Sequence, residues 1–359
     1  MYIVLMAGGI GTRFWPRSRI SSPKQMLNIL GNGSMLRLTY NRIKGLTEDE
    51  KILVITNTEL TDMVREDLPE LPVQNIIAEP FGRNTAPCIG LAASIIQKRS
   101  GFNEEVMVVL PADHLIEEED NFRETLHVAE QYAREHQCLI TMGITPSYPE
   151  TGYGYIQKDK VISTELGKKI YKVKTFAEKP NFDIAQRFIQ SGDFLWNSGM
   201  FIWTTESIMA NFEEHQPDLV DGLHLIREVV DTPRMDETIF DVYSKIKSIS
   251  IDYGILEVAS NVCVIEADFK WNDIGSWEAV YNISEKDKNG NAVFAEDHLL
   301  LDSKNNYFFS SKKLVTAIDV ENLVVVETDD AILICRKDRS QRVKDLVDIM
   351  RRKDRHKYL

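Results

Sequence analysis

A glycine-rich turn near the start of the chain is the first feature whose residues could do chemistry. Gly8, Gly9 and Gly11 follow a short apolar run and are followed at once by Thr12 and Arg13. Glycines let a backbone approach a ligand closely, and exposed N–H groups in such a turn can point at phosphate oxygens. The pattern therefore predicts a strand that ends in an anion-binding loop.

The charge around this turn is opposite to that of the whole chain. The 359 residues carry a formal net charge of −13, yet residues 1–47 include seven basic residues and no aspartate or glutamate. The seven are Arg13, Arg17, Arg19, Lys24, Arg37, Arg42 and Lys44. A local basic excess in an acidic chain indicates a polyanionic ligand. The overall acidity argues against nucleic acid as the main partner, because nucleic-acid binding needs a broad basic surface.

The turn matches neither of the two common phosphate-binding motifs. It lacks the GxxxxGK[ST] pattern of the P-loop, and Phe14 stands where the dinucleotide fingerprint GxGxxG has its third glycine. A glycine-rich turn after a strand is as often structural as functional when it stands alone. The surrounding residues must therefore decide what the loop binds.

Strands and helices alternate in the part of the chain that must position this loop. Apolar runs predict strands at 2–6, 52–55, 76–78, 106–110 and 139–144, and helical spacing is found at 34–44, 59–68, 87–98 and 121–136. Alternation of this kind predicts an α/β fold, a doubly wound and mostly parallel sheet with helices on both faces. Ligands of such sheets lie beyond the carboxyl ends of the strands. The glycine loop and the stretch PADH at 111–114 both have that position.

The last fifth of the chain has a different character. A polar, turn-rich stretch at 286–291 precedes a mainly β pattern that includes 324–327 and 331–335. We therefore expect an α/β domain over 1–287 and a small β-rich domain over 288–359. The chain should end in an amphipathic helix that buries the apolar side chains Val343, Leu346, Val347 and Met350. Its basic side is expected to be solvated rather than to bind membrane or RNA.

Composition suggests the compartment. Cys88, Cys138, Cys263 and Cys335 are far apart and form no CxxC pair, which argues against disulfides or a zinc site and suits a reducing cytoplasm. No signal peptide and no apolar run of about 20 residues is present. We expect a cytoplasmic protein with no membrane partner.

Seven sequence blocks together resemble one family. The stretch AGGIGTR at 7–13, with FWPRSR and then SPKQ at 22–25, resembles the signature of the nucleotide-diphospho-sugar transferase superfamily. Within it, the sequence is similar to the mannose-1-phosphate guanylyltransferase (GDP-mannose pyrophosphorylase) family. The other blocks follow in that family's usual order: EPFGRNTAP at 79–87, PADH at 111–114, TGYGYI at 151–156, EKP at 178–180, WNSGMF at 196–201 and DFKWNDIGSW at 268–277. Six further blocks in order over most of the chain exclude chance.

The resemblance implies both a fold and a reaction. It implies a Rossmann-like catalytic domain followed by a β-rich domain of the left-handed β-helix type. It also implies an enzyme, a Mg²⁺-dependent nucleotidyltransferase that binds GTP and mannose 1-phosphate and makes GDP-mannose and pyrophosphate. Such a transfer depends on charge neutralisation and in-line positioning more than on a protein nucleophile. Family members often form dimers, so a homodimer is expected.

The phosphate-handling residues follow from the matched blocks. Arg13 would clamp the triphosphate, and Lys24 would neutralise the leaving pyrophosphate. Asp113 and Asp273 would hold the Mg²⁺, with Asp268 as a nearby rival to Asp273. Magnesium often takes only one or two protein carboxylates. The nucleotide-binding set implied by the resemblance is Leu5, Ala7, Gly8, Gly9, Gly11, Thr12, Arg13, Lys24, Glu79, Pro80 and Asn84.

The sugar and base contacts depend most on the resemblance. Lys179, counted with Arg13 and Lys24 as catalytic, would bind the sugar phosphate. The sugar ring would lie against Gly152, Glu178 and Asn197. Guanine offers donors at N1 and N2, which Glu79 or the nearby backbone could accept. Arg83 and Asn84 either contact the nucleotide or cap the next helix, and the sequence does not decide between these.

Two other functions remain open at this point. The acceptor could be another hexose or heptose 1-phosphate, because sugar specificity rests on a few pocket contacts. Alternatively, the chain could be a non-catalytic regulatory homologue that binds a sugar nucleotide without turning it over.

Overall fold

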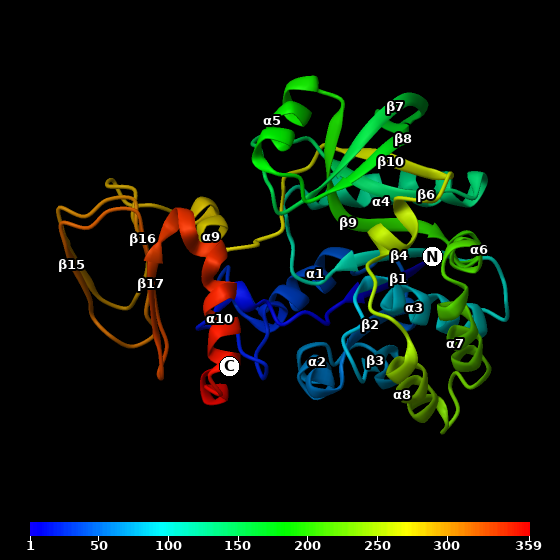
Figure 1. Cartoon of the computed structure of the whole chain (residues 1–359), viewed down its shortest axis with the longest axis horizontal. Helices are drawn as coiled ribbons and strands as arrows, with labels where there is room; N and C mark the ends of the chain where they lie inside the picture. The colour runs from blue at the N-terminus through cyan, green and yellow to red at the C-terminus, as the bar shows by residue number, and fades with distance from the viewer. The chain divides into compact units, whose positions relative to one another are not determined.

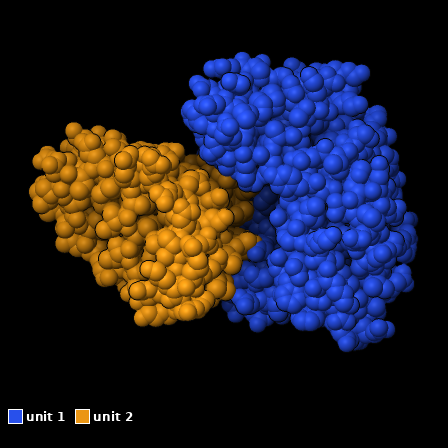
Figure 2. Space-filling model, viewed as in Figure 1, with its two compact units in different colours: residues 1–8, 40–112, 116–271 blue, residues 9–39, 113–115, 272–359 orange.

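The structure is a computed structural model that describes all residues, 1–359. It divides into two compact units, which Figure 2 colours separately. Unit 1 consists of Met1–Gly8, Tyr40–Ala112 and Ile116–Trp271, and unit 2 consists of Gly9–Thr39, Asp113–Leu115 and Asn272–Leu359. The chain therefore passes from unit 1 to unit 2 directly after Gly8, within the glycine loop.

Unit 1 is built on a nine-stranded sheet with the order β3-β2-β1-β4-β9-β6-β10-β8-β7. Its strands are β1 (Tyr2–Met6), β2 (Ile52–Asn57), β3 (Ile76–Glu79), β4 (Val106–Pro111), β6 (Leu139–Ile144), β7 (Gly154–Glu165), β8 (Lys168–Glu178), β9 (Phe194–Thr204) and β10 (Val262–Ala267). Only β8 and β9 run against the other strands. The α/β fold with a mostly parallel sheet is confirmed.

Helices cover the sheet of unit 1, and several of them pack together (Figure 1). Their bounds are α2 (Thr61–Asp67), α3 (Thr85–Arg99), α4 (Glu119–His136), α5 (Phe182–Ser191), α6 (Thr205–His215), α7 (Pro217–Glu228) and α8 (Met235–Lys245). Tyr2 and Val4 of β1 belong to a core that includes much of α3, α6 and α7. Ile3 and Leu5 point to the opposite face of the sheet and are also fully buried. The sheet is thus covered on both faces.

Strand order departs from a simple alternating pattern at β9. β1 pairs in parallel with both β2 and β4, so the loops after β1 and β4 leave the same edge of the sheet. The next strand along the sheet is β9, which is antiparallel to both β4 and β6. Local periodicity cannot reveal such an insertion, because β9 follows β6 by about 50 residues in the chain.

Unit 2 combines an N-terminal segment with the C-terminal part of the chain. Its β strands form two small sheets: β12 (Ala292–Phe294), β14 (Tyr307–Phe309), β16 (Leu323–Glu327) and β17 (Ile332–Arg336) in one, and β13 (His298–Leu301) with β15 (Val315–Ile318) in the other. All neighbours except β16 and β17 are parallel. From β12 to β16, successive strands alternate between the two sheets and pair in parallel within each sheet. This arrangement is typical of a β-helix.

The core of unit 2 brings the two ends of the chain together. Phe14 and Trp15, from the N-terminal segment, pack in one cluster with Trp277, Tyr307 and Val347. The rings of Phe14 and Trp277 meet edge to face at 5.1 Å, and the indole N–H of Trp277 donates to the carbonyl of Trp15. The segment that carries Arg13 and Lys24 is therefore held by the C-terminal residues.

Further helices and short elements have the following bounds. They are α1 (Met35–Ile43), α9 (Trp277–Ile283), α10 (Val343–Arg352), the short strands β5 (Leu115–Ile116) and β11 (Trp271–Asn272), and the 3₁₀ turns η1 (Thr12–Phe14), η2 (Lys24–Met26) and η7 (Lys337–Arg342). The predicted terminal helix is α10, which buries Val343, Val347 and Met350 but leaves Leu346 more than one-third exposed. No helix is both long and apolar enough to cross a membrane.

Candidate active site

Gly11 is the residue of the glycine loop whose conformation requires glycine. Its φ is +68°, in the left-handed region, and a Cβ added there would lie 2.3 Å from Cβ of Lys24. The Gly11 carbonyl accepts hydrogen bonds from the Ser18 hydroxyl and the Phe14 N–H. The loop therefore closes over the backbone of Lys24, and Gly11 makes that approach possible.

Lys24 is a buried cation, with only 5% of its surface exposed. Its ammonium nitrogen lies 2.9 Å from a carboxylate oxygen of Asp113 and 2.5 Å from the backbone carbonyl of Asp273. Burial acts to raise the pKa of Asp113. The charge of Lys24, that of His114 and hydrogen bonds outweigh burial and hold this pKa below its usual value. Asp113 is thus ionised at neutral pH, and Lys24 joins the two loops that carry the predicted metal ligands.

These residues surround a cavity in unit 2 of about 280 Å³. It is lined by Gly11, Thr12, Arg13, Phe14, Lys24, Asp113, His114, Asp273, Gly275 and Lys344. A Cβ on Gly275 would lie 2.6 Å from a carboxylate oxygen of Asp273, so glycine at 275 leaves room for that side chain. Both predicted metal ligands and both predicted triphosphate cations therefore line one cavity.

Asp268, the rival to Asp273, is engaged elsewhere. It belongs to unit 1, where its carboxylate lies 2.7 Å from the ammonium of Lys168 and its backbone carbonyl accepts a hydrogen bond from Asn121. Burial acts to raise the pKa of Asp268, but the hydrogen bonds and charge of Lys168 lower it overall. Asp268 thus has a structural ion pair, whereas Asp273 lines the cavity.

The beginning of the glycine loop lies in unit 1. The Ala7 N–H donates to the carbonyl of Ile55, and the Ala7 carbonyl accepts from the hydroxyl of Thr56. Leu5 is wholly buried within the sheet, so its side chain does not reach the surface. A Cβ on Gly9, in unit 2, would meet nothing within 4 Å. The open space at Gly9 is what close approach of a ligand to the backbone requires.

Glu79 is a buried carboxylate at the end of β3, with 7% of its surface exposed. The phenol of Tyr243, on α8, donates a hydrogen bond of 2.9 Å to it. Burial raises the pKa of Glu79 to about 7, although the Tyr243 hydrogen bond acts in the opposite direction. Glu79 can therefore switch from acceptor to donor near neutral pH, and the half-buried Pro80 follows it.

Arg83 and Asn84 both have structural partners. The Arg83 guanidinium donates from Nε to the backbone carbonyl of Tyr243, at 2.8 Å. Asn84 is the N-cap of α3, with φ of 70°, and its side-chain oxygen accepts from the Thr85 N–H. These contacts favour the capping alternative for Asn84. They also connect Arg83 to the element that positions Glu79.

The predicted sugar-binding residues lie in another part of unit 1. The side chains of Glu178 and Lys179 are bonded to each other, with Glu178 9% exposed and Lys179 59% exposed. Lys179 has φ of +48°, outside the usual range for lysine. Gly152 donates its N–H to Glu150, while a Cβ on Gly154 would lie 2.5 Å from a carboxylate oxygen of Glu178. Gly154, rather than Gly152, is the glycine that makes room for the Glu178 carboxylate.

Asn197 is bonded on both sides of its amide. Its nitrogen donates to a carboxylate oxygen of Asp252 at 2.8 Å, and its oxygen accepts from Thr141 and from the Gly199 N–H. Burial first, and then the charge of Glu178, raise the pKa of Asp252 to about 6. The structure thus places a second carboxylate near Glu178, with Asn197 orienting it.

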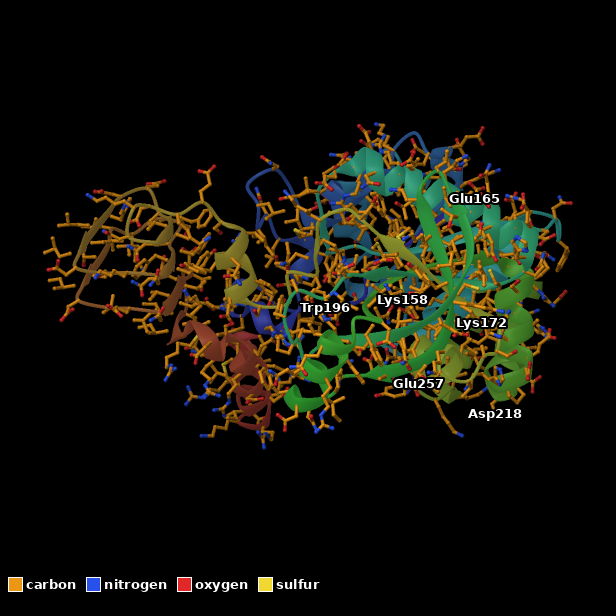
Figure 3. The ribbon with its side chains drawn as sticks, turned by 90° about the horizontal axis from the view of Figure 1, so that it is seen from above. Lys158, Glu165, Lys172, Trp196, Asp218 and Glu257 are labelled. Carbon is orange, nitrogen blue, oxygen red and sulfur yellow. The ribbon has the colours of Figure 1, made fainter.

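Aromatic rings flank this site. Trp196, which precedes Asn197 on β9 and is labelled in Figure 3, meets Tyr148 at 4.9 Å and Tyr153 at 5.2 Å between ring centroids. Glu257, also labelled there, lies at the end of the helical turn that begins at Asp252. Burial and the charge of Glu178 raise the pKa of Glu257. The aromatic walls and the carboxylates together form a surface suited to a polyhydroxylated ring.

Three residues were missed by sequence reasoning. Asp252 and Tyr243 occur in no block that resembles the family, and only tertiary contacts bring them to Asn197 and Glu79. Lys344 belongs to the terminal helix, whose basic side is expected from the sequence to be solvated, and it lines the cavity with Arg13 and Lys24. The one available signal was the position of Lys344 in the first turn of its helix, where a cation is unusual.

Comparisons with known proteins complete the description of the site. A family model described as nucleotidyl transferase matches residues 2–290, and a model described as a mannoseP isomerase/GMP-like beta-helix domain matches residues 296–350. The chain is 40% identical to a mannose-1-phosphate guanylyltransferase of Klebsiella pneumoniae, over 99% of this chain and 75% of the relative. A protein of the same name from Escherichia coli (strain K12) is 38% identical over 100% of this chain and 75% of the relative.

A solved structure agrees with these relatives along nearly the whole chain. It is described as a mannose-1-phosphate geranyltransferase from Thermus thermophilus and is similar to this chain with a TM-score of 0.86 at 29% identity. The match covers 98% of this chain and 99% of that one.

Proposed function

Because the chain belongs to the nucleotidyl transferase family and, within it, to the mannose-1-phosphate guanylyltransferases, we propose that it transfers GMP from GTP to mannose 1-phosphate. An oxygen of the sugar phosphate forms a bond to the α-phosphorus of GTP. The bond from that phosphorus to the bridging oxygen breaks, and pyrophosphate leaves with the bonding electrons. The products are GDP-mannose and pyrophosphate.

The observation that carries this proposal is the buried Lys24 between the two metal-ligand loops. Its ammonium contacts the carboxylate of Asp113 and the backbone of Asp273, beside the closed turn at Gly11. A buried lysine held by two loops is a preorganised point charge, which suits the stabilisation of a leaving polyanion. Arg13, whose side chain forms no hydrogen bond or ion pair, supplies a fork of donors on the same cavity.

The donor set of the cavity fits Mg²⁺. Asp113 and Asp273 offer hard oxygen ligands, and the chain has no cluster of three or more metal-binding side chains that would suit zinc or a larger cage. Magnesium typically takes one or two protein carboxylates and completes its octahedron with phosphate oxygens and water. When bound, it would neutralise charge on the phosphate oxygens. Asp113 and Asp273 would hold it there.

The sugar is proposed to bind to the carboxylate pair in unit 1. Glu178 and Asp252 would accept hydrogen bonds from sugar hydroxyls, and Asn197 would orient Asp252 rather than bind the sugar itself. The Lys179 side chain is exposed, so its ammonium could leave the carboxylate of Glu178 and pair with the phosphate of mannose 1-phosphate instead. Ionised Glu79, which Tyr243 orients, would accept hydrogen bonds from the guanine N–H groups.

A pyrophosphate-release assay tests the function directly. GTP, ATP, UTP and dTTP would each be combined with mannose 1-phosphate and with glucose 1-phosphate, at fixed Mg²⁺. We expect turnover to be fastest with GTP and mannose 1-phosphate. Equal rates with all four nucleotides would reject the guanine assignment, and a faster reaction with another sugar 1-phosphate would reject the mannose assignment. No turnover with any pair would indicate a regulatory homologue.

Two properties of the whole protein belong to the proposal. A cytoplasmic location is supported by four cysteines that form no disulfide, three of them buried. A homodimer is proposed from the family resemblance, and sedimentation velocity would distinguish it from a monomer.

A further inference from the structure

The first turn of α10 brings a lysine to the cavity of unit 2. Val343, Val347 and Met350 are buried on the inner side of this helix, in the core that also contains Phe14. Lys344 is exposed and lines the cavity together with Arg13 and Lys24. Since Val343 is anchored in the core, the backbone that carries Lys344 has a defined position relative to the cavity.

Lys344 differs from the other basic residues of this helix. Arg342 lies 3.0 Å from Asp345, and Arg351 lies 3.4 Å from Asp348. Arg352 donates to the backbone carbonyl of Asp348. The side chain of Lys344 forms no hydrogen bond and no ion pair. Its charge is therefore not used to stabilise the helix.

The position of Lys344 is also unfavourable for the helix itself. A helix carries partial positive charge at its N-terminus, so anions are stabilising in the first turn and cations are destabilising there. The acidic residue in the first turn of α10 is Asp345, which follows the usual preference and pairs with Arg342. Lys344 opposes that preference. A charge that local stability does not explain, on the wall of a cavity, indicates a ligand of opposite charge.

We propose that Lys344 binds the β- and γ-phosphates of GTP, and hence the pyrophosphate product, as a third cation beside Arg13 and Lys24. This inference rests on the proposed function. A lysine ammonium is a compact point charge on a flexible stem. Lys344 can therefore contact those oxygens of the β- and γ-phosphates that no other residue of the chain binds. The C-terminal helix is then part of the phosphate site rather than only a packed terminus.

Pyrophosphorolysis is the sharpest test, because in that direction pyrophosphate and the sugar nucleotide are separate substrates. Lys344→Gln should raise KM for pyrophosphate about tenfold, as expected for the loss of one charge-assisted contact at an exposed site. KM for GDP-mannose should stay within about twofold of wild type, a change of less than about 0.5 kcal/mol. Lys344→Arg should retain most of the affinity for pyrophosphate, because the charge is kept.

Stability and salt dependence separate a binding role from a structural one. Removing a cation from the first turn should leave Tm unchanged or slightly raised. The KM for pyrophosphate of Lys344→Gln should also increase less with added salt than that of wild type. Lys353→Gln, which neutralises an exposed lysine just after the same helix, is the matched control and should change neither quantity.

The outcomes distinguish this inference from the proposed function. If wild type catalyses the reaction and Lys344→Gln has the same KM for pyrophosphate, the inference is wrong and the function stands. A lower Tm together with equal losses for both substrates would show that Lys344 serves the fold, and would also overturn the inference. If wild type catalyses no reaction, calorimetric titration with Mg²⁺–pyrophosphate decides. Tighter binding by wild type than by Lys344→Gln would support the site, and equal binding would reject it.

Discussion

At the scale of single residues, the site depends on carboxylates whose ionisation is set by burial and by neighbouring charges. Glu79, Asp113 and Asp252 differ in what surrounds them. Asp113 has a buried cation beside it and a lowered pKa, whereas Glu79 and Asp252 have raised ones. In the proposed function the three carboxylates would therefore take different ligands: a metal ion for Asp113, and hydrogen-bond donors of the base and the sugar for the other two.

Binding of GTP should weaken as the pH falls through 7. The guanine N–H groups need an acceptor, and the raised pKa of Glu79, about 7, means that its carboxylate is protonated below that pH. Between pH 8 and pH 6 the ionised fraction falls about tenfold, so Kd for GTP should rise by a similar factor. Calorimetric titration at several pH values measures this.

Two variants of this pair act as controls for that pH dependence. Tyr243→Phe removes the hydrogen bond that lowers the pKa of Glu79, so the midpoint should move to higher pH. Glu79→Gln should bind GTP weakly at every pH, and its Kd should not show the change near pH 7 that ionisation of Glu79 is expected to cause. An unchanged transition in Glu79→Gln would show that the triphosphate, not Glu79, is the titrating group.

Asp252 should determine how well the sugar phosphate binds. Asp252→Asn is expected to raise KM for mannose 1-phosphate about 10–100-fold, the usual effect of losing a hydrogen bond to a charged group, with Kd for GTP unchanged. Steady-state kinetics with deoxy analogues of the sugar measures the contact. With the analogue that lacks the hydroxyl bound by Asp252, wild type and Asp252→Asn should have the same KM.

The matched control is Asp218→Asn. Asp218, labelled in Figure 3, lies on α7 with a side chain 93% exposed and should have no effect on sugar kinetics. If Asp252→Asn impairs every analogue by the same factor, Asp252 supports the fold and does not accept a particular hydroxyl.

At the scale of elements, the glycine loop combines two different requirements. Gly11 is needed by the fold, because of its positive φ and its contact with Lys24. Gly9 has open space where a Cβ would be, so only a ligand would require glycine there. The basic residues among the first 47 likewise have two kinds of role, in the cavity and in structural contacts. Arg13 and Lys24 line the cavity, but Arg19 pairs with Asp330, and Arg17 lies over the ring of Phe309.

Substitutions at these two glycines should separate stability from binding. Gly11→Ala is expected to destabilise the fold by about 1–3 kcal/mol, because alanine is strained at this φ and its Cβ collides with Lys24. Gly9→Ala should leave Tm nearly unchanged and weaken GTP binding. Thermal denaturation and calorimetric titration of both variants test this. Wild-type affinity for GTP in Gly9→Ala would contradict the assignment of this loop to the triphosphate.

At the scale of the whole molecule, sequence and packing divide the chain at different places. The sequence suggests a boundary near residue 288, and the two family models meet between residues 290 and 296. By packing, residues 9–39 belong with residues 272–359 in unit 2. The cavity of unit 2 that Arg13 and Lys24 line is therefore built jointly by N-terminal and C-terminal segments.

A chain truncated after residue 287 should consequently lose the cavity of unit 2. The truncation removes Tyr307 and α10, and exposes Phe14 and Trp277, which are 1% and 0% exposed in the intact chain. We expect aggregation or a red-shifted tryptophan spectrum, and loss of measurable pyrophosphate binding. Intrinsic fluorescence and calorimetry check this. A soluble truncated chain with wild-type affinity for pyrophosphate would show that residues 1–287 suffice.

Much of this protein follows from its sequence alone. The strand at Tyr2–Met6 has the predicted bounds, and those of the four helices expected in the first 136 residues differ by only a few residues, because local periodicity and turn residues determine such elements. The family blocks also indicated the chemistry, since the reaction requires particular residue types in particular loops. Local patterns could not place β9 between β4 and β6, or give Asp252 and Tyr243 a role.

Only the tertiary structure decided which distant groups meet. The ammonium of Lys24 reaches Asp273 across 249 positions of the chain, and Lys344 joins Arg13 on one cavity wall. Contacts of this kind come from packing of the unit 2 core around Phe14 and Trp277, and no local pattern records them. The sequence by itself thus determined the type of chemistry and most of the local elements. The long-range packing determined the partner, the burial and hence the ionisation of each group that carries it.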